Sequence, residues 1–193
     1  MQDYITQSIV EGIKLKEGIL NNHQMMADIE TVGNLMAQTL QQGHKVLLCG
    51  NGGSAADAQH IAAELVGRFV TEREGLPAIA MTTDTSILTA VSNDYGFSRI
   101  FERQTAALGS KGDILIALST SGNSPNVEYA LQKAKAMDIT TVGFLGRNGG
   151  KCKDLCDYSF IIPHLESARI QEIHITIGHI LCGIVDNKLV SHG

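Results

Sequence analysis

Residues 113–125, with the sequence Asp-Ile-Leu-Ile-Ala-Leu-Ser-Thr-Ser-Gly-Asn-Ser-Pro, decide the fold. The apolar first half predicts a buried strand over 113–119, and the residues that follow predict a helix over 124–137. Ser124 stands where an N-cap is expected, and Pro125 occupies the first helical position, where a missing N–H costs nothing. Hydroxyl groups and free backbone N–H groups therefore meet between a strand and a helix N-terminus, which predicts a phosphate site without an obligatory cation.

The alternation of strand and helix runs through the chain from residue 45. Strands are predicted at 45–50, 78–81, 113–119, 140–145 and 158–162, and helices at 54–70, 86–91, 96–108, 124–137 and 166–189. Because strands separated by helices are joined by right-handed crossovers, we expect a parallel sheet with helices on both faces, which is a three-layer α/β sandwich. Such sheets bind ligands beyond the carboxyl ends of their strands.

Two further helices are predicted before the first strand. Residues 3–20 and 25–41 carry isoleucine, leucine and methionine side chains at near-helical spacing, and Gly43 ends the second segment. The first helix lies outside the strand–helix repeat, so we expect it to pack against another subunit. No linker or strong internal repeat divides the sequence, which predicts a single domain over 1–193, with a helical pair at 1–42 and an α/β core at 43–193.

The composition of the chain argues against disorder, nucleic-acid binding and membrane insertion. The chain has 193 residues, of which 44% are hydrophobic, so a folded domain with a sizeable core is expected rather than disorder. The net charge is −5 and lysine and arginine form no block, which disfavours nucleic-acid binding. No apolar run is long enough to span a membrane, and residues 1–4 open no signal peptide, so we expect a cytoplasmic protein without a membrane partner.

The four cysteines give no strong signal of a metal or redox site. Cys49 and Cys182 lie in apolar segments, where small core residues are expected. Cys152 and Cys156 have a C-x3-C spacing that could place them one helical turn apart. A zinc or redox pair is one interpretation, but no second pair completes a site, so two ordinary thiols are expected.

The first strand ends in a glycine-rich loop, residues 50–57, with the sequence Gly-Asn-Gly-Gly-Ser-Ala-Ala-Asp. Its glycines let the backbone approach a ligand closely, although their spacing matches neither the dinucleotide fingerprint nor the P-loop. One interpretation is a tight turn with a capping box formed by Ser54 and Asp57. The other is a ligand-binding role at the strand end for Asn51, Gly52, Gly53 and Ser54.

Two predicted helices carry side chains suited to metal binding or proton transfer. His60 and Glu64 are four residues apart and share a face, where they form either a metal-binding or acid–base pair or an ordinary surface hydrogen bond. On the last helix, Gln171 and His179 lie on one stripe, where the alternative is a core histidine bonded to a neighbour. Gly178 beside His179 permits a close approach of another element.

Two other positions carry weaker signals. His174 lies on a different face of the last helix and is expected to be structural or at the surface. Asn93 and Asp94 precede Tyr95 and Gly96, and this sequence predicts a turn between two helices.

These segments, in this order, resemble the sugar isomerase (SIS) family, and most closely its phosphoheptose isomerases. The resemblance extends over nearly the whole chain, including the two N-terminal helices. The serine-rich loop alone indicates a phosphosugar-binding SIS module, whereas the histidines and their partners on the two helices indicate the heptose enzymes. The segments that carry the resemblance are residues 49–54, the helix with Asp57, His60, Glu64, Gly67 and Arg68, the pair Asn93 and Asp94, residues 119–124, and residues 169–174 with His179.

The resemblance implies a fold, an assembly and a set of site residues. The fold is a five-stranded parallel sheet of flavodoxin-like order in an αβα sandwich, and the assembly is a homotetramer with active sites between subunits. One zinc ion per subunit is implied on His60, Glu64, Gln171 and His179. The phosphate is implied on Ser119, Thr120, Ser121 and Ser124, with further substrate contacts from Asn51, Gly52, Gly53, Ser54, Glu64, Asn93, Asp94 and Gln171. Ala168 stands where some members have an aspartate, so no acid role is carried over there.

The activity implied by the resemblance is conversion of sedoheptulose 7-phosphate to D-glycero-D-manno-heptose 7-phosphate through an enediolate. This reaction is the first step of nucleotide-activated heptose synthesis for lipopolysaccharide or capsule. Glu64 and His179 match the family's acid–base residues, with Glu64 removing the carbon-bound proton and His179 moving the hydroxyl or carbonyl proton. Another phosphosugar is one alternative substrate. The other alternative is a non-catalytic SIS tetramer that binds the replication initiator protein, and such a scaffold would not need these side chains.

Overall fold

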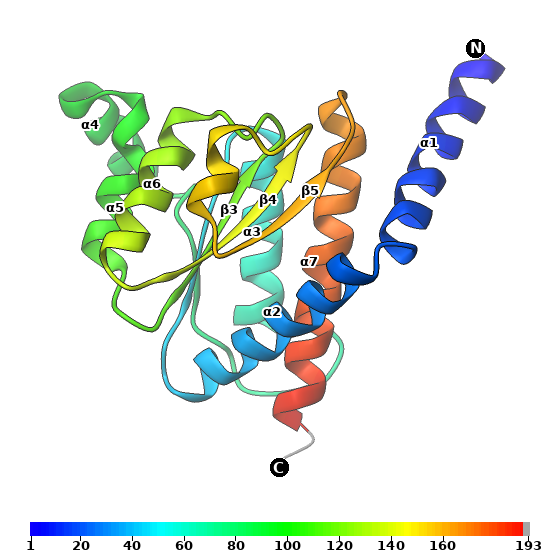
Figure 1. The fold of residues 1–193 in the computed structure, drawn as a ribbon. Coiled ribbons are helices and arrows are strands. Elements are labelled where there is room, and N and C mark those ends of the chain that lie inside the picture. Colours follow the sequence, from blue (N-terminus) through cyan, green and yellow to red (C-terminus); the bar gives the residue numbers. More distant parts are fainter. Residues whose placement is uncertain (191–193) are drawn as a thin grey trace.

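The computed structural model describes residues 1–190 and is built around one parallel sheet (Figure 1). Its strands are β1 (Val46–Cys49), β2 (Ala78–Ala80), β3 (Ile114–Ser119), β4 (Thr140–Gly146) and β5 (Tyr158–Ile162). They are hydrogen-bonded in the order β2-β1-β3-β4-β5, and every neighbouring pair is parallel. The predicted sheet of flavodoxin-like order is therefore confirmed. The carboxyl ends of β1 and β3 lie side by side at the point where the strand order reverses, which is where open α/β sheets bind ligands.

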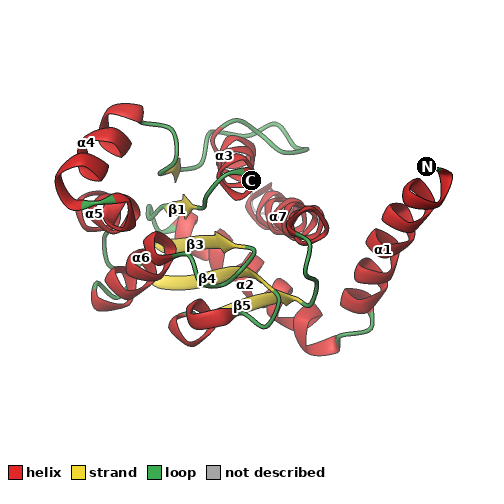
Figure 2. Cartoon of the chain, turned by 90° about the horizontal axis from the view of Figure 1, so that it is seen from above, coloured by secondary structure: helices red, strands yellow, loops and turns green. Residues whose placement is uncertain are grey.

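Helices cover both faces of the sheet (Figure 2). One face carries α2 (His23–Gln41), α3 (Gly53–Val66) and α7 (Ser167–Val190), and the other carries α4 (Thr85–Tyr95), α5 (Ile100–Leu108) and α6 (Pro125–Ala136), with the 3-10 turns η1 (Phe97–Arg99) and η2 (Gly150–Leu155). Strand residues alternate between two cores, so Leu48 and Ile116 face the first whereas Leu47 and Leu115 face the second. Burial on both faces confirms the predicted three-layer sandwich.

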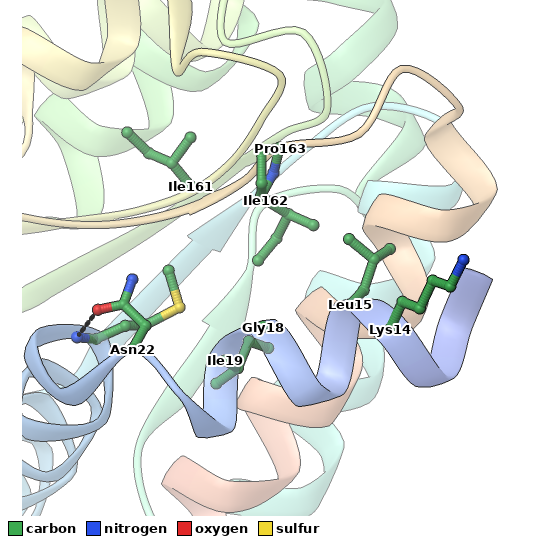
Figure 3. Close-up of a pocket in the computed structure, with 9 residues that line it drawn as sticks. Lys14, Leu15, Gly18, Ile19, Asn22, Ile161, Ile162 and Pro163 are labelled. Carbon is green, nitrogen blue, oxygen red and sulfur yellow. Dashed lines mark hydrogen bonds between the residues drawn. The ribbon is translucent and has the colours of Figure 1, made fainter. Parts of the chain in front are cut away.

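Helix α1 (Gln2–Leu20) stands apart from this core (Figures 1 and 2). None of its residues is buried, and Ile5, Ile9 and Ile13 leave 54%, 59% and 51% of their surface exposed. Leu15 and Ile19 pack against the edge of the core, beside a pocket of about 240 Å³ that separates α1 from the end of β5 (Figure 3). The apolar stripe of α1 therefore contributes little to the core of its own chain.

The C-terminal boundary predicted for the helix after β1 was wrong. Helix α3 ends at Val66 rather than at residue 70. The backbone turns at Gly67, and the side chain of Arg73 donates hydrogen bonds to the carbonyls of Glu64 and Leu65. The Leu65 carbonyl also accepts a hydrogen bond of 3.0 Å from the Leu76 N–H. Gly67 is the C-cap of α3, a glycine at the position where helices commonly end.

Two predictions in the segment 86–108 were also wrong. Helix α4 runs through the predicted turn, so that Asn93 and Asp94 are helical, and Gly96 ends the helix with a φ of +88° that glycine adopts freely. The helix predicted over 96–108 is divided into η1 and α5. The short turn η2 was not predicted.

The four cysteines are free thiols. Cys49 and Cys182 are buried in the two cores, as predicted, and Cys152 lies in η2 with Cys156 directly after it. Burial raises the pKa of Cys152 to about 11 and the pKa values of Cys156 and Cys182 to about 12, and it raises that of Cys49 further. Thiols with such pKa values stay protonated and are poor nucleophiles and metal ligands.

Helix α7 is apolar but does not qualify as a membrane segment, since no helix among the described residues combines the length and hydropathy that crossing a bilayer requires. It carries the buried His174, whose Nε2–H donates to the carbonyl of Leu145 at 3.1 Å. The other ring nitrogen, Nδ1, has no hydrogen-bond partner. Burial lowers the pKa of His174 to about 4, although the bond to Leu145 opposes the shift. His174 is thus a neutral structural residue.

Stability should consequently fall on acidification in a way that depends on His174. Its folded-state pKa of about 4 lies below its ordinary value of 6.5, so its contribution is complete above pH 6.5 and is lost as the pH falls toward 4. The loss is about 3 kcal/mol. We expect His174→Gln to be less stable than the wild type at pH 7 but to lose less stability between pH 7 and 4. Urea denaturation across this range measures the difference, and parallel stability curves for the two proteins would contradict the assignment.

Candidate functional site

The serine-rich loop forms a cluster of hydroxyl groups at the carboxyl end of β3. Ser119 Oγ lies 2.9 Å from Ser124 Oγ and 3.5 Å from Ser121 Oγ, and it accepts a hydrogen bond of 3.1 Å from the Gly122 N–H. Ser124 is the N-cap of α6 and Pro125 the first helical residue, as predicted. The hydroxyl of Ser124 does not cap the helix but turns toward Ser119. Hydroxyls and a helix N-terminus therefore converge as a phosphate site requires.

The loop after β4 locks this cluster in place. Gly122 has a φ of +66°, and a Cβ at this position would collide with the carbonyl of Gly149. The Cys152 N–H donates to the Gly122 carbonyl at 2.9 Å, and the Lys151 N–H donates to Asn123 Oδ1 at 3.1 Å. The two loops thus support each other, and the glycines that allow their contact gave the only sequence signal for it.

The glycine-rich loop after β1 lies beside the serine cluster. The side-chain amides of Asn51 and Asn126 exchange two hydrogen bonds of 2.8 and 2.9 Å, which join β1 to the start of α6. Asn126 is buried and was not identified from the sequence, because an asparagine early in a helix has no distinctive pattern. The predicted capping box is wrong, since Gly52 is the N-cap of α3, without a side-chain cap, and Ser54 is buried inside the helix.

Three side chains converge on the seam between α3 and α7. His60 Nε2 lies 3.2 Å from Glu64 Oε1 and 2.9 Å from His179 Nε2. One ligand atom from each residue lies within 4.8 Å of the others. Two facing imidazole nitrogens need one shared proton or a cation between them. Two imidazoles and one carboxylate are also the donors that zinc prefers at catalytic sites, where a fourth position stays open.

Two further side chains, those of Phe69 and Asp57, lie near these three residues. The ring of Phe69 stacks on His179 with 5.6 Å between centroids, and the His60 ring meets His179 edge-on at 5.0 Å. Asp57 lies one helical turn before His60, and its Oδ2 is buried without a hydrogen-bond partner. Burial raises the pKa of Asp57, and the nearby His60 partly offsets the shift. Phe69 was assigned no role from the sequence, and Asp57 was predicted only as part of a capping box with Ser54.

Gln171 lies toward the other end of the α3–α7 contact from these three residues. It lies eight residues before His179 on α7, which is about 12 Å along the helix axis. Its amide packs against Gly53, where an added Cβ would lie 2.5 Å from Nε2. Because α3 and α7 run in the same direction, Gln171 lies at the level of the first turn of α3, and His179 lies two turns further down, beside His60.

Asn93 and Asp94 form a third group, at the end of α4. The Asn93 amide donates to Asp94 Oδ1 at 2.9 Å, and both residues are exposed. Helix α4 lies on the opposite side of the sheet from α7 (Figures 1 and 2). The hydroxyl of Thr120 lies 3.0 Å from that of Ser167, the first residue of α7. One chain therefore gathers the phosphate-type groups in one place, the potential metal ligands in a second, and the α4 pair in a third.

Comparison with known proteins places the chain among enzymes. The profile of a family described as SIS domain matches residues 16–146. The chain is 51% identical to a phosphoheptose isomerase of Clostridium acetobutylicum over 98% of its length and 96% of the relative's. The chain belongs to the phosphoheptose isomerase family. A relative of the same name from Aquifex aeolicus is 61% identical over 83% of this chain and 84% of its own.

Solved structures agree with this membership. The phosphoheptose isomerase of Neisseria gonorrhoeae superposes with a TM-score of 0.90 at 42% identity, covering 96% of this chain and 98% of its own. That of Francisella tularensis gives a TM-score of 0.92 at 38% identity with the same coverage. The resemblance noted from the sequence is therefore confirmed for both family and fold.

The locked serine loop gives a direct test of the phosphate site. Gly122→Ala forces a strained φ and a collision with the Gly149 carbonyl, so we expect affinity for a phosphosugar to fall by at least about tenfold. Gly43→Ala is the matched control, because Gly43 has a φ of +80° but open space around it. It should cost about 1–2 kcal/mol of stability and leave binding unchanged. Calorimetric titration measures both, and equal binding by the two variants would contradict the role of the loop.

Proposed function

We propose that this member of the phosphoheptose isomerase family converts sedoheptulose 7-phosphate to D-glycero-D-manno-heptose 7-phosphate. The observation that carries the proposal is the convergence of His60, Glu64 and His179 within 4.8 Å on the α3–α7 seam. A binding scaffold has no need of a carboxylate and two imidazoles in contact, and no feature of the described residues favours a replication-initiator partner. The product would supply nucleotide-activated heptose for lipopolysaccharide or capsule, in the cytoplasm.

The reaction moves two protons and requires no external oxidant. The Glu64 carboxylate takes the proton from C1 of the ketose and returns it to C2, while electrons of the broken C–H bond form the enediolate. His179 carries the proton between the C1 hydroxyl and the C2 carbonyl oxygen. His60 orients the side chains of both Glu64 and His179, since its Nε2 contacts the Glu64 carboxylate and the His179 ring.

The proposed cofactor is zinc, one ion per subunit. His60, Glu64 and His179 would hold it, and when bound it would supply positive charge that polarises the carbonyl and stabilises the developing oxyanion. Gln171 is proposed as a further ligand and substrate contact. Side chains on a helix point toward its N-terminus, so the amide of Gln171 points away from His179. We propose that it joins a metal site through a second copy of the chain.

The substrate phosphate is proposed to lie in the serine cluster. The groups assigned to it are Ser119, Thr120, Ser121 and Ser124, with sugar contacts from Asn51, Gly52, Gly53, Ser54, Glu64, Asn93, Asp94 and Gln171. The phosphate binds far from the reacting carbons and supplies binding energy that fixes them. Gly53 and His60 are seven residues apart on α3, about 10 Å along the helix axis, and this separation supports a site that a second subunit completes.

We propose a homotetramer with active sites between subunits, and the separation of the site groups along α3 and α7 supports it. The exposed isoleucines of α1 supply apolar surface for such contacts, and burying them is favourable. Site groups that lie apart on one chain would then meet across an interface.

The catalytic assignment is tested with Glu64→Gln. The amide cannot accept the carbon-bound proton, so turnover of sedoheptulose 7-phosphate should fall about a thousandfold while its binding changes by less than about threefold. Glu72→Gln is the control, because Glu72 has an 87% exposed side chain paired with Arg68 on the surface. Chelation of the wild type should abolish turnover and added zinc should restore it. Undiminished turnover in Glu64→Gln would remove Glu64 from the mechanism, and no turnover by folded wild type would overturn the substrate.

The shared active site is tested by mixing inactive variants. Glu64→Gln lacks the base but keeps the serine loop, whereas Gly122→Ala disrupts the loop but keeps the base. If each site draws these groups from two subunits, about one quarter of the sites in an equimolar, exchanged mixture carry both intact groups. Activity should therefore return on mixing, and native mass spectrometry should show tetramers. No recovery from confirmed mixed tetramers would assign both groups to the same subunit.

A further inference from the structure

The segment between α3 and β2, residues 67–77, is fixed by one carboxylate of α7. Asp186 Oδ2 accepts hydrogen bonds from the Val70 and Thr71 N–H groups at 3.0 and 3.1 Å. Its Oδ1 accepts from Arg73 Nε at 2.7 Å. The side chains of Asp186 and Arg73 are only 2% and 7% exposed. Burial alone would raise the pKa of Asp186, but these donors lower it below its usual value, so Asp186 is a carboxylate at neutral pH.

Arg73 extends the contact to the end of α3. Its Nη2 donates to the Glu64 carbonyl at 3.0 Å, and its Nη1 donates to the Leu65 carbonyl at 2.9 Å and more weakly to that of Gly67 at 3.3 Å. These carbonyls lie where the helix ends, and the Leu65 carbonyl also accepts from the Leu76 N–H at 3.0 Å. The guanidinium therefore anchors the backbone of Glu64, whose side chain touches His60.

Phe69 connects the segment held by Asp186 to the His179 ring. It directly precedes Val70, whose N–H is bound to Asp186, and its ring is stacked on the imidazole at 5.6 Å with 24° between the planes. Asp186 lies seven residues after His179 on α7, about 10 Å along the axis. One carboxylate thus ties the segment that carries Phe69 to the helix that carries His179.

Stability alone does not call for an ion pair at this position. Desolvation of two buried charges offsets most of their attraction, and well-packed apolar residues of similar size are often as stabilising. The hydrogen bonds of the pair instead fix three elements relative to one another, namely α3, α7 and the segment between them. Such fixation matters where side chains must hold a metal or transfer a proton, because partners outside the ligand set orient the ligands.

We propose that Arg73 and Asp186 are positioning residues that hold Phe69 against His179 and the end of α3 at Glu64 in register with α7. The inference rests on the proposed function only for the chemical roles of Glu64 and His179. Its structural content is that loss of the pair displaces the His179 ring even where the protein remains folded.

The test uses variants that separate geometry from stability. Asp186→Asn leaves the Arg73 charge buried with a weakened partner, which is strongly destabilising. The informative protein is therefore the double variant Arg73→Met with Asp186→Leu, which removes both charges. Phe69→Leu removes the ring at the His179 end of the contact. Val70→Ala is the control, because it keeps the backbone N–H and its side chain is 70% exposed.

Three readouts are measured on each protein. We expect the double variant and Phe69→Leu to lose about tenfold in zinc affinity by chelator competition. In proteins that turn over the ketose, kcat should fall by about tenfold while KM changes less than about twofold. The NMR shift of the His179 Cε1 proton, which senses the ring current of Phe69, should move in the double variant although Phe69 is still present.

A double variant that folds with an unchanged His179 shift, zinc affinity and kcat would overturn the proposal. Failure of the proposed function has a different signature, since a wild type that does not turn over the ketose leaves the NMR and zinc readouts to decide the positioning role. Wild-type values in Val70→Ala together with losses in the other two variants support it.

Discussion

The close, parallel contact of α3 with α7 is the constraint on which the rest of the structure depends. Gly178 makes it possible, because a Cβ there would lie 2.6 Å from Ile61 Cδ1. Without that approach, the imidazoles of His60 and His179 could not lie 2.9 Å apart. The same seam sets Gln171 against Gly53 at one end and Asp186 against the segment after α3 at the other. The pairing of α3 with α7 therefore fixes the relative positions of these polar groups along the two helix axes.

The sequence predicted those features whose cause is local or periodic. The strand Tyr158–Ile162 and the position of Ser124 as N-cap follow from β-branched runs and helix-start chemistry, and both are confirmed. The pair His60 and Glu64 follows from helical spacing alone. The sheet order and the assignment of His179 to the same cluster needed the family resemblance, because neither is contained in one segment of sequence.

Some features depend on contacts that no local pattern contains. The predicted capping box is wrong because Gly52, rather than Ser54, is the N-cap of α3, and Ser54 is buried. Asn126 escaped notice because its partner, Asn51, is 75 residues away. Phe69 could not be identified either, because the ring on which it stacks, that of His179, belongs to α7. Local propensity describes what a segment prefers, and tertiary contacts decide where that preference ends.

The interlock of the loops after β3 and β4 has an entropic consequence. Flexible loops that close on a ligand lose conformational freedom at the moment of binding, and that loss weakens affinity. Here the Gly122 carbonyl is already bonded to η2, and the backbones of Gly122 and Gly149 are already in contact. The hydroxyl cluster is consequently shaped during folding, when the ordering cost is shared with the whole domain. If the cluster is the proposed phosphate site, the free energy of binding there is not spent on ordering these two loops and remains available to orient the rest of the bound molecule.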